Sequence, residues 1–229
     1  MSDESKLSGN LRRVQDMIAE ACHRAGRRPD SVTLVAVTKY VDTETAKLLA
    51  SAGCRELGES RPQELVRKAQ ALSDLAIRWN LVGHLQRNKI KQVIPYCALV
   101  HSVDSVRLLE AVDACCVKLG LVCDVLIEVN ISGESVKTGA QPSETPALFE
   151  RAAELASVRV RGLMGMAALD VSHAEIQRQF ASLRQLRDEL VERWPHHPLP
   201  ELSMGMSGDF PQAIAEGATL VRIGSLLFE

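Results

Sequence analysis

The chain has 229 residues, of which 46% are hydrophobic and 24% charged, proportions typical of a soluble globular protein rather than a fibrous or disordered one. Its formal net charge is −2 and its aromatic content is 3%, which argues against general nucleic-acid binding through a basic surface or stacked rings. No apolar run approaches the roughly 20 residues of a membrane span, and the polar N-terminus lacks a signal-peptide core. We therefore expect a cytoplasmic protein with no membrane or nucleic-acid partner, whose cysteines are reduced and bind no metal.

Short β-branched runs alternate with longer stretches that have helical periodicity. Leu11, Val14 and Ile18 form one apolar stripe of an opening helix, and Gly26 ends it. The elements expected after that are punctuated by capping residues, glycines and prolines. In chain order, the expectations are helix 7–25, strand 32–38, helix 43–52, strand 54–58, a helix from 62, strand 79–82, helix 86–94, strand 99–102, helix 105–119, strand 123–131, helix 143–156, strand 158–163, helix 173–193, strand 201–204, helix 210–216 and strand 219–223.

Every expected strand except the last is followed by a helix. Nearly continuous apolar strands separated by helices indicate a parallel sheet covered by helices on its outside. Eight such units fit a (β/α)8 TIM barrel, formed by residues 1–229 as a single domain with an extra N-terminal helix. A doubly wound open sheet is the alternative fold.

Lys39 ends the first expected strand and shares its side with Val35 and Val37. The chemistry of a barrel lies at the C-terminal ends of its strands, so this lysine is expected at the functional face. Apolar surroundings favour the neutral amine that forms a Schiff base. The alternative is a lysine that merely caps the strand where the chain meets water.

Arg222 lies within the apolar run of the last expected strand. A buried guanidinium is costly unless an anion or a strong acceptor accompanies it. The partner could be a ligand, or a neighbouring strand could supply a structural ion pair through Glu128 or Glu56.

Small residues follow the seventh and eighth expected strands, at 203–209 and at 224–225. Glycines let backbone N–H groups approach an anion, and serine hydroxyls add donors. Barrels commonly bind phosphate at these two loops, so their pairing predicts a phosphate site, although either loop alone could simply turn the chain.

Several longer motifs, in order over nearly the whole chain, resemble the pyridoxal phosphate homeostasis protein family (YggS/PROSC), whose barrel is similar to the N-terminal domain of alanine racemase. The matching stretches are LVAVTKY around Lys39, GES with RPQE at 58–64, WNLVGHLQRNK at 79–89, EVNISGESVKTG at 128–139, VRGLMGMA at 160–167, LSMGMSGDF at 202–210 and VRIGSLLFE at the end.

The resemblance implies pyridoxal 5′-phosphate (PLP) held as an aldimine on Lys39, with Arg222 facing its pyridine nitrogen. It implies that Met164 and the segment near Val82 line the ring. Ser60 is expected beside the ring, but the family commonly carries Asn-Tyr where this chain has Ser60 and Arg61, so its side chain has a shorter reach. The residues implied for the phosphate are Ser203, Gly205, Ser207, Gly224 and Ser225.

An arginine opposite the pyridine nitrogen disfavours the protonated ring that acts as an electron sink. Racemisation also needs an acid or base on each face of the substrate Cα. Alanine racemase takes its second base, a tyrosine, from an additional domain, whereas this chain stops at Glu229 and Tyr40 is expected on the side of the strand opposite Lys39.

We therefore expect a monomeric PLP carrier without strong catalysis of its own, which releases the cofactor to apo PLP enzymes. One alternative is a PLP-dependent amino-acid racemase or lyase of narrow scope. Another is a barrel that binds a phosphorylated metabolite without a covalent bond.

Overall fold

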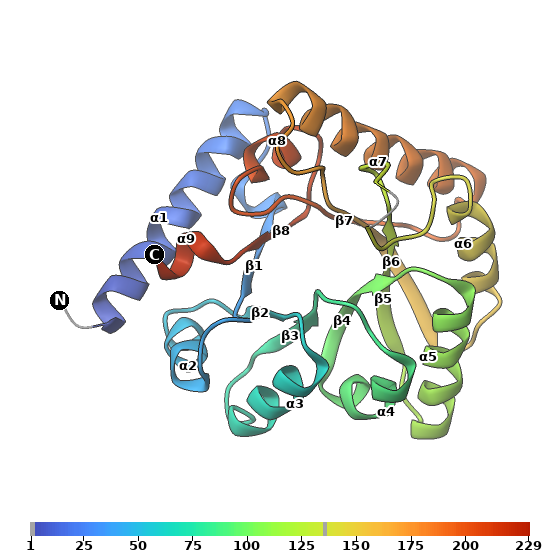
Figure 1. Ribbon diagram of the computed structural model, residues 1–229, viewed down its shortest axis with the longest axis horizontal. Helices are drawn as coiled ribbons and strands as arrows, with labels where there is room; N and C mark the ends of the chain where they lie inside the picture. The colour runs from blue at the N-terminus through green and yellow to red at the C-terminus, as the bar shows by residue number, and fades with distance from the viewer. Residues whose placement is uncertain (1–2, 135–136) are drawn as a thin grey trace.

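The computed structural model describes residues 3–134 and 137–229, and its centre is a closed barrel of eight parallel strands in sequence order (Figure 1). The barrel closes where β1 pairs with β8, with Val35 opposite Arg222. This confirms the predicted (β/α)8 barrel and excludes the open sheet. The strands are β1 Thr33–Val37, β2 Glu56–Glu59, β3 Arg78–Leu81, β4 Cys97–Val103, β5 Cys123–Val129, β6 Val158–Gly165, β7 Glu201–Ser203 and β8 Leu220–Ile223.

Helices surround the barrel, as Figure 1 shows, and bury their apolar faces against the strands. Side chains cap several of them: the Asp42 carboxylate accepts from Thr45 N at the start of α2, and the Ser105 hydroxyl accepts from Leu108 N at the start of α5. The helices are α1 Asp3–Arg24, α2 Thr43–Ser51, α3 Pro62–Ala71, α4 Ile90–Val93, α5 Val106–Leu119, α6 Thr145–Ala153, α7 His173–Arg193, α8 Phe210–Ala215 and α9 Ser225–Phe228.

The extra helix α1 lies outside the first and last βα units, against α2, α8 and α9. Its buried stripe contains Leu11, Val14 and Ile18, as the sequence predicts. On the same helix the Asn10 amide donates to the carbonyl oxygens of Leu227 (3.2 Å) and Glu229 (3.0 Å). Helix α1 therefore holds the C-terminal turn in place.

Two predictions of local structure are wrong. The helix expected at 86–94 is broken into a 3-10 turn (Arg87–Lys89), the single turn α4 and a second 3-10 turn (Ile94–Tyr96) that contains Pro95, which cannot donate a helical hydrogen bond. Helix α9 follows the last strand, where no helix was expected. Its four residues are too few to show a helical period in the sequence.

The barrel interior contains an apolar layer with polar side chains above it. The layer consists of Val35, Leu99, Leu126, Met164 and Leu220. Because alternate residues of a strand face the same side, His101 and Arg222 lie one step nearer the C-terminal mouth than Leu99 and Leu220. In the described ranges no helix is both long and apolar enough to cross a membrane.

Candidate functional site

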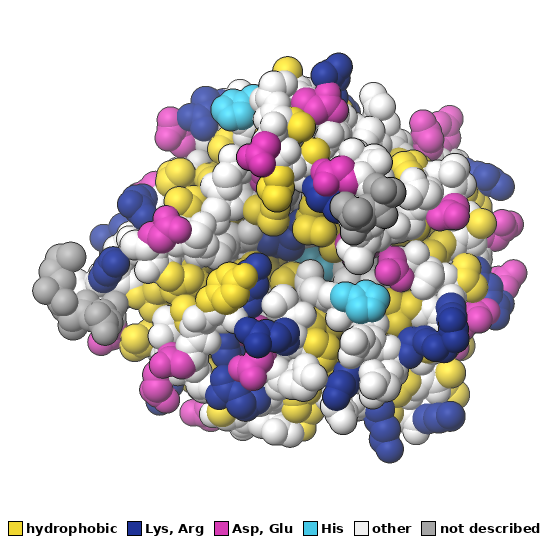
Figure 2. All heavy atoms as spheres, in the orientation of Figure 1, with side chains coloured by type: hydrophobic (Ala, Val, Ile, Leu, Met, Phe, Trp, Pro, Cys, Tyr) yellow, Lys and Arg dark blue, Asp and Glu magenta, His cyan; other side chains and the backbone are white. Residues whose placement is uncertain are grey.

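A cavity of about 590 Å³ lies at the C-terminal ends of the strands. Figure 2 shows a hollow near the middle of the face in view, with basic side chains inside it and apolar side chains around it. The cavity therefore occupies the position where barrels carry out their chemistry. Its lining residues are Val37, Lys39, Tyr40, Val41, Ser60, Val82, Met166, Met206, Ser207, Gly208, Arg222, Gly224, Ser225, Phe228 and Glu229.

Lys39 lies in the turn that follows β1 and is half-buried. Its Nζ lies 4.8 Å from the ring centre of Tyr40, and the amine has no hydrogen bond or ion pair to the described part of the chain. The expectation that Tyr40 lies on the opposite side is wrong, because β1 ends at Val37 and strand alternation does not extend to the turn. The lysine thus presents an uncommitted amine to the cavity.

A buried ion pair lies directly beneath the turn. The Lys68 ammonium, 1% exposed, donates to Glu59 Oε1 at 2.5 Å and to the Thr38 carbonyl at 2.7 Å. The Thr38 hydroxyl donates to the same carboxylate oxygen at 2.8 Å. Because Thr38 precedes Lys39 and Glu59 precedes Ser60, this network fixes the ends of both strands that carry predicted site residues.

Ser60 and Val82 lie in the loops after β2 and β3, which approach each other closely at Gly83. A Cβ built at Gly83 would lie 2.2 Å from the Ser60 carbonyl oxygen. The Ser102 hydroxyl also donates to the Gly83 carbonyl at 2.7 Å. Only a glycine allows this approach, so Gly83 determines where Ser60 sits in the cavity wall.

Arg222 enters the cavity from β8 and is 5% exposed. Its Nη1 donates to the Ser203 carbonyl (2.7 Å) and hydroxyl (2.6 Å), and its Nη2 donates to the Gly165 carbonyl (3.0 Å). The proposed ion pair with Glu128 or Glu56 is absent from the contacts of the described residues. Neutral oxygens hold this guanidinium.

Burial lowers the pKa of Arg222 to about 10, against the opposing attraction of Asp209 and Glu128. At neutral pH the guanidinium is therefore charged, and it presents a fixed positive group to the cavity. Burial raises the pKa of both carboxyls, since the nearby positive charge of Arg222 only partly compensates for the loss of water.

The loops after β7 and β8 are joined by hydrogen bonds. Gly224 N donates to the Ser207 hydroxyl oxygen at 3.3 Å, and Arg222 N donates to the Gly205 carbonyl at 2.9 Å. No described residue accepts a hydrogen bond from the backbone N–H group of Ser207 or of Gly208. Free backbone donors and serine hydroxyls in one place provide what an anionic group needs.

The structure brings most of the predicted site residues together. Three predicted residues do not line the cavity: Met164 lies in the apolar layer, Ser203 supports Arg222 from beneath, and Gly205 packs against α8. Met166, two residues beyond Met164 on the same side of the chain, lines the wall instead. The predicted residues that do line the cavity are Lys39, Ser60, Val82, Ser207, Arg222, Gly224 and Ser225.

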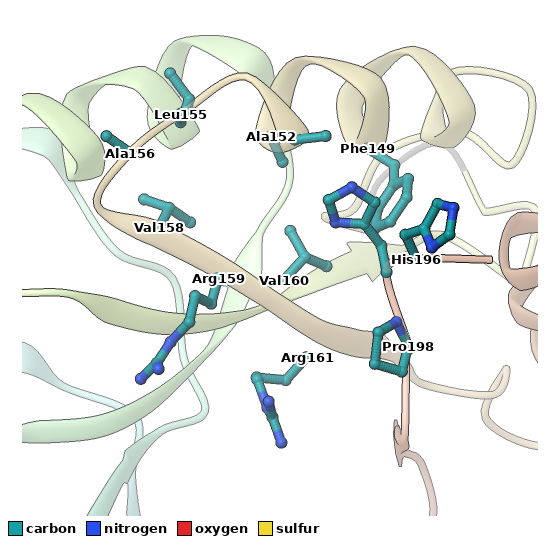
Figure 3. Close-up of a pocket in the computed structure, with 12 residues that line it drawn as sticks. Phe149, Ala152, Leu155, Ala156, Val158, Arg159, Val160, Arg161, His196 and Pro198 are labelled. Atoms are coloured by element: carbon teal, nitrogen blue, oxygen red, sulfur yellow. The ribbon is translucent and has the colours of Figure 1, made fainter. Parts of the chain in front are cut away.

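A second cavity, of about 290 Å³, lies at the start of β6 (Figure 3). Phe149 and Val158 contribute apolar surface, and the Phe149 ring meets the His197 ring edge-on, with 6.0 Å between the ring centres. Its Arg159 is already paired with Asp124, at 2.7 Å. No lysine is among its described lining residues, so it lacks the amine that distinguishes the first cavity.

The chain is similar to known proteins over nearly its whole length. Residues 3–229 match the family model "Alanine racemase, N-terminal domain". The pyridoxal phosphate homeostasis protein of Aquifex aeolicus is 43% identical over 218 residues, 95% of each chain.

Solved structures that share this fold over nearly the whole chain include the following two. One is an unknown protein from Bifidobacterium adolescentis, with a TM-score of 0.93, 36% identity and coverage of 99% of this chain and 96% of that one. The other is PipY of Synechococcus elongatus with PLP bound, with a TM-score of 0.82, 37% identity and coverage of 93% and 100%. The chain belongs to the alanine racemase N-terminal domain family, alongside the relatives named pyridoxal phosphate homeostasis protein.

Proposed function

We propose that the protein binds PLP in the cavity at the barrel mouth and takes part in intracellular PLP homeostasis by holding and releasing it. One observation carries this proposal: a single cavity combines the uncommitted amine of Lys39, the charged Arg222 and the free N–H groups of Ser207 and Gly208 in the β7 loop. These groups match an aldehyde, a ring nitrogen and a phosphate. The relatives' names and the PLP-bound PipY structure support the same conclusion.

Each group of residues has a distinct part in binding. The Lys39 amine would bond reversibly to the aldehyde carbon, since a neutral primary amine is the nucleophile that this requires. Ser207, Gly224 and Ser225 would hold the phosphate through hydroxyl and backbone donors. Ser203 and Gly205 would contribute from beneath, by holding Arg222 and by shaping the loop.

The ring would lie between apolar wall residues, with Val82 and Met166 in contact with it and Met164 below. Ser60 would reach its edge from the β2 loop. Arg222 would face the ring nitrogen as a donor, because a charged guanidinium has no lone pair to accept a proton.

These residues provide little for amino-acid chemistry. Bound PLP stabilises a carbanion best when its ring nitrogen is protonated, and the fixed charge of Arg222 opposes that protonation. Racemisation also needs acid and base groups on both faces of the substrate. Tyr40 follows Lys39 in the same turn and its ring lies 4.8 Å from the amine, so it is not a base opposite the lysine. A carrier fits this geometry better than a racemase or lyase.

We also propose that the protein is a monomer and that its partners are apo PLP enzymes. A monomer whose cavity opens to solvent would release PLP to apo PLP enzymes in one of two ways. Either another amine displaces Lys39 from the aldehyde carbon, or water hydrolyses the bond between Lys39 and PLP. Mixing the loaded protein with an apo PLP enzyme, with and without an aldehyde trap, tests the transfer. The trap alone measures the rate at which the protein releases PLP spontaneously. We expect the apo enzyme to regain activity faster than this rate. If it regains activity no faster than PLP is released spontaneously, direct transfer to the enzyme is refuted.

The enzyme alternative has its own test. The purified, loaded protein is incubated with single L-amino acids, and D-isomer and keto acid are measured, with Lys39→Ala as the control. We expect no turnover above that of the control. Sustained, Lys39-dependent turnover would overturn the carrier proposal.

A further inference from the structure

A chain of buried polar side chains runs from Arg222 into the barrel. It passes through Ser203 on β7, His101 on β4 and Asn80 on β3, which are 0%, 0% and 1% exposed, and ends at Glu56, the first residue of β2. It thus connects the cavity to the opposite end of the barrel. Because water does not reach its middle members, each donor must find its acceptor within the protein.

The bonds at Asn80 determine the direction of the chain. Its amide nitrogen lies near three acceptors: Glu56 Oε2 (2.8 Å), the Arg78 carbonyl (3.1 Å) and the Leu57 carbonyl (3.4 Å). The amide oxygen therefore faces His101, whose Nε2 lies 3.0 Å away. An amide oxygen only accepts, so His101 Nε2 must carry a hydrogen and donate it.

The other end of the imidazole follows from this. A neutral ring with Nε2–H has a lone pair on Nδ1, which lies 2.9 Å from the Ser203 hydroxyl oxygen. The serine hydroxyl must therefore donate to His101, which leaves its own lone pairs for Arg222 Nη1 at 2.6 Å. Every bond from Arg222 to Glu56 is then satisfied by one arrangement of protons.

A charged imidazole would break this arrangement. Both ring nitrogens would donate, and the serine hydroxyl hydrogen would be turned towards the guanidinium. Burial and the charge of Arg222 keep the pKa of His101 well below its usual value, in agreement with a neutral ring.

We infer that His101 is a positioning residue for PLP binding: as the neutral Nε2–H tautomer it orients the Ser203 hydroxyl and so fixes the Arg222 guanidinium at the floor of the cavity. The inference rests on the proposed function, in which that guanidinium would face the ring nitrogen of PLP. His101 is not among the residues that line the cavity, so it would act on the cofactor only through Ser203.

Two amide substitutions separate the two bonds of the imidazole. His101→Asn places an amide near the position of Nδ1 and keeps a partner for Ser203, whereas His101→Gln places one near Nε2 and keeps a partner for Asn80. His101→Leu removes both partners. His196→Leu, at an exposed histidine of the second cavity, is the matched control.

The first measurement needs no cofactor. Long-range ¹H–¹⁵N NMR of the PLP-free protein reports the His101 tautomer, and the guanidinium signals of Arg222 report its rotation about the Nε–Cζ bond. We expect the Nε2–H tautomer at pH 7, with slow rotation in the wild type, His101→Asn and His196→Leu and faster rotation in His101→Gln. An Nδ1–H or charged ring, or equal rotation in the Asn and Gln variants, would overturn the inference.

The second measurement is PLP titration followed by visible absorption across pH. We expect the Kd of His101→Gln and His101→Leu to rise about tenfold, or about 1.4 kcal/mol, with a displaced pH midpoint of the absorption band, while His101→Asn stays near the wild type. Equal Kd values and midpoints in Asn and Gln variants would refute the role in binding. If the wild-type protein fails to bind PLP, the proposed function is refuted, and NMR of the PLP-free protein alone decides whether His101 positions Arg222.

Discussion

Replacing Lys68 by methionine would remove one partner of the buried ion pair beneath Lys39. Lys68 and Glu59 are 1% and 0% exposed, and Glu59 Oε2 already lacks a partner within the described chain. In Lys68→Met the carboxylate keeps only the Thr38 hydroxyl on its other oxygen. An unpaired buried charge costs about 3–5 kcal/mol, so we expect the free energy of unfolding to fall by that amount.

The double variant Glu59→Leu/Lys68→Met removes both charges. The Thr38 hydroxyl retains the Gly58 carbonyl at 3.2 Å as its acceptor, so less is left unsatisfied. We expect the second change to recover about 2 kcal/mol of the loss. Urea unfolding of the PLP-free proteins, followed by circular dichroism, measures all the variants. A single variant as stable as the wild type, or no more damaging than the double, would refute the reasoning.

Three further changes test other parts of the site. Gly83→Ala places a Cβ 2.2 Å from the Ser60 carbonyl oxygen and should lower the free energy of unfolding by about 1–3 kcal/mol. The control Gly9→Ala, in open space on α1, should raise it by about 0.5–1 kcal/mol. Urea unfolding measures both, and a similar change in the two variants would contradict the close approach at Gly83. Ser207→Ala should weaken PLP binding about tenfold in an absorption titration but leave binding of phosphate-free pyridoxal unchanged, and equal losses would exclude Ser207 from the phosphate site. Burial and the charge of Arg222 hold the pKa of His101 well below 6.5, so below about pH 6.5 the unfolded chain binds a proton that the folded protein does not, and His101 lowers the free energy of unfolding by about 1.4 kcal/mol for each pH unit. Urea unfolding at pH 7.5 and 5.5 should show this loss in the wild type and not in His101→Asn. The same pH dependence of stability in both proteins would contradict a neutral His101.

The barrel could be predicted because its strands are apolar runs with glycines and prolines between them, and these are local signals. The break of the 86–94 helix and the short α9 could not be, since single turns have no measurable period. Strand alternation also failed at Tyr40, because the strand ends before it.

The site was predictable where a residue departs from its surroundings. Lys39 after an apolar strand and Arg222 inside one are such departures, and the structure places both in one cavity. Of the residues that support them, Ser203 was expected, although at the phosphate rather than beneath Arg222, and the others were missed. Lys68 lies on an amphipathic helix and resembles a surface lysine, while the partners of His101 lie 21 and 102 residues away along the chain. Contacts of that kind arise from barrel closure, which spacing in one sequence does not encode.

The central claim is that PLP is bound covalently by Lys39, and borohydride reduction followed by peptide mass spectrometry tests it most directly. Reduction converts the bond between an amine and an aldehyde into a stable secondary amine that survives digestion. We predict a single pyridoxyl-modified peptide that contains Lys39, together with loss of the visible absorption band. A label on another lysine, or an unmodified Lys39 peptide from protein saturated with PLP, would contradict the account.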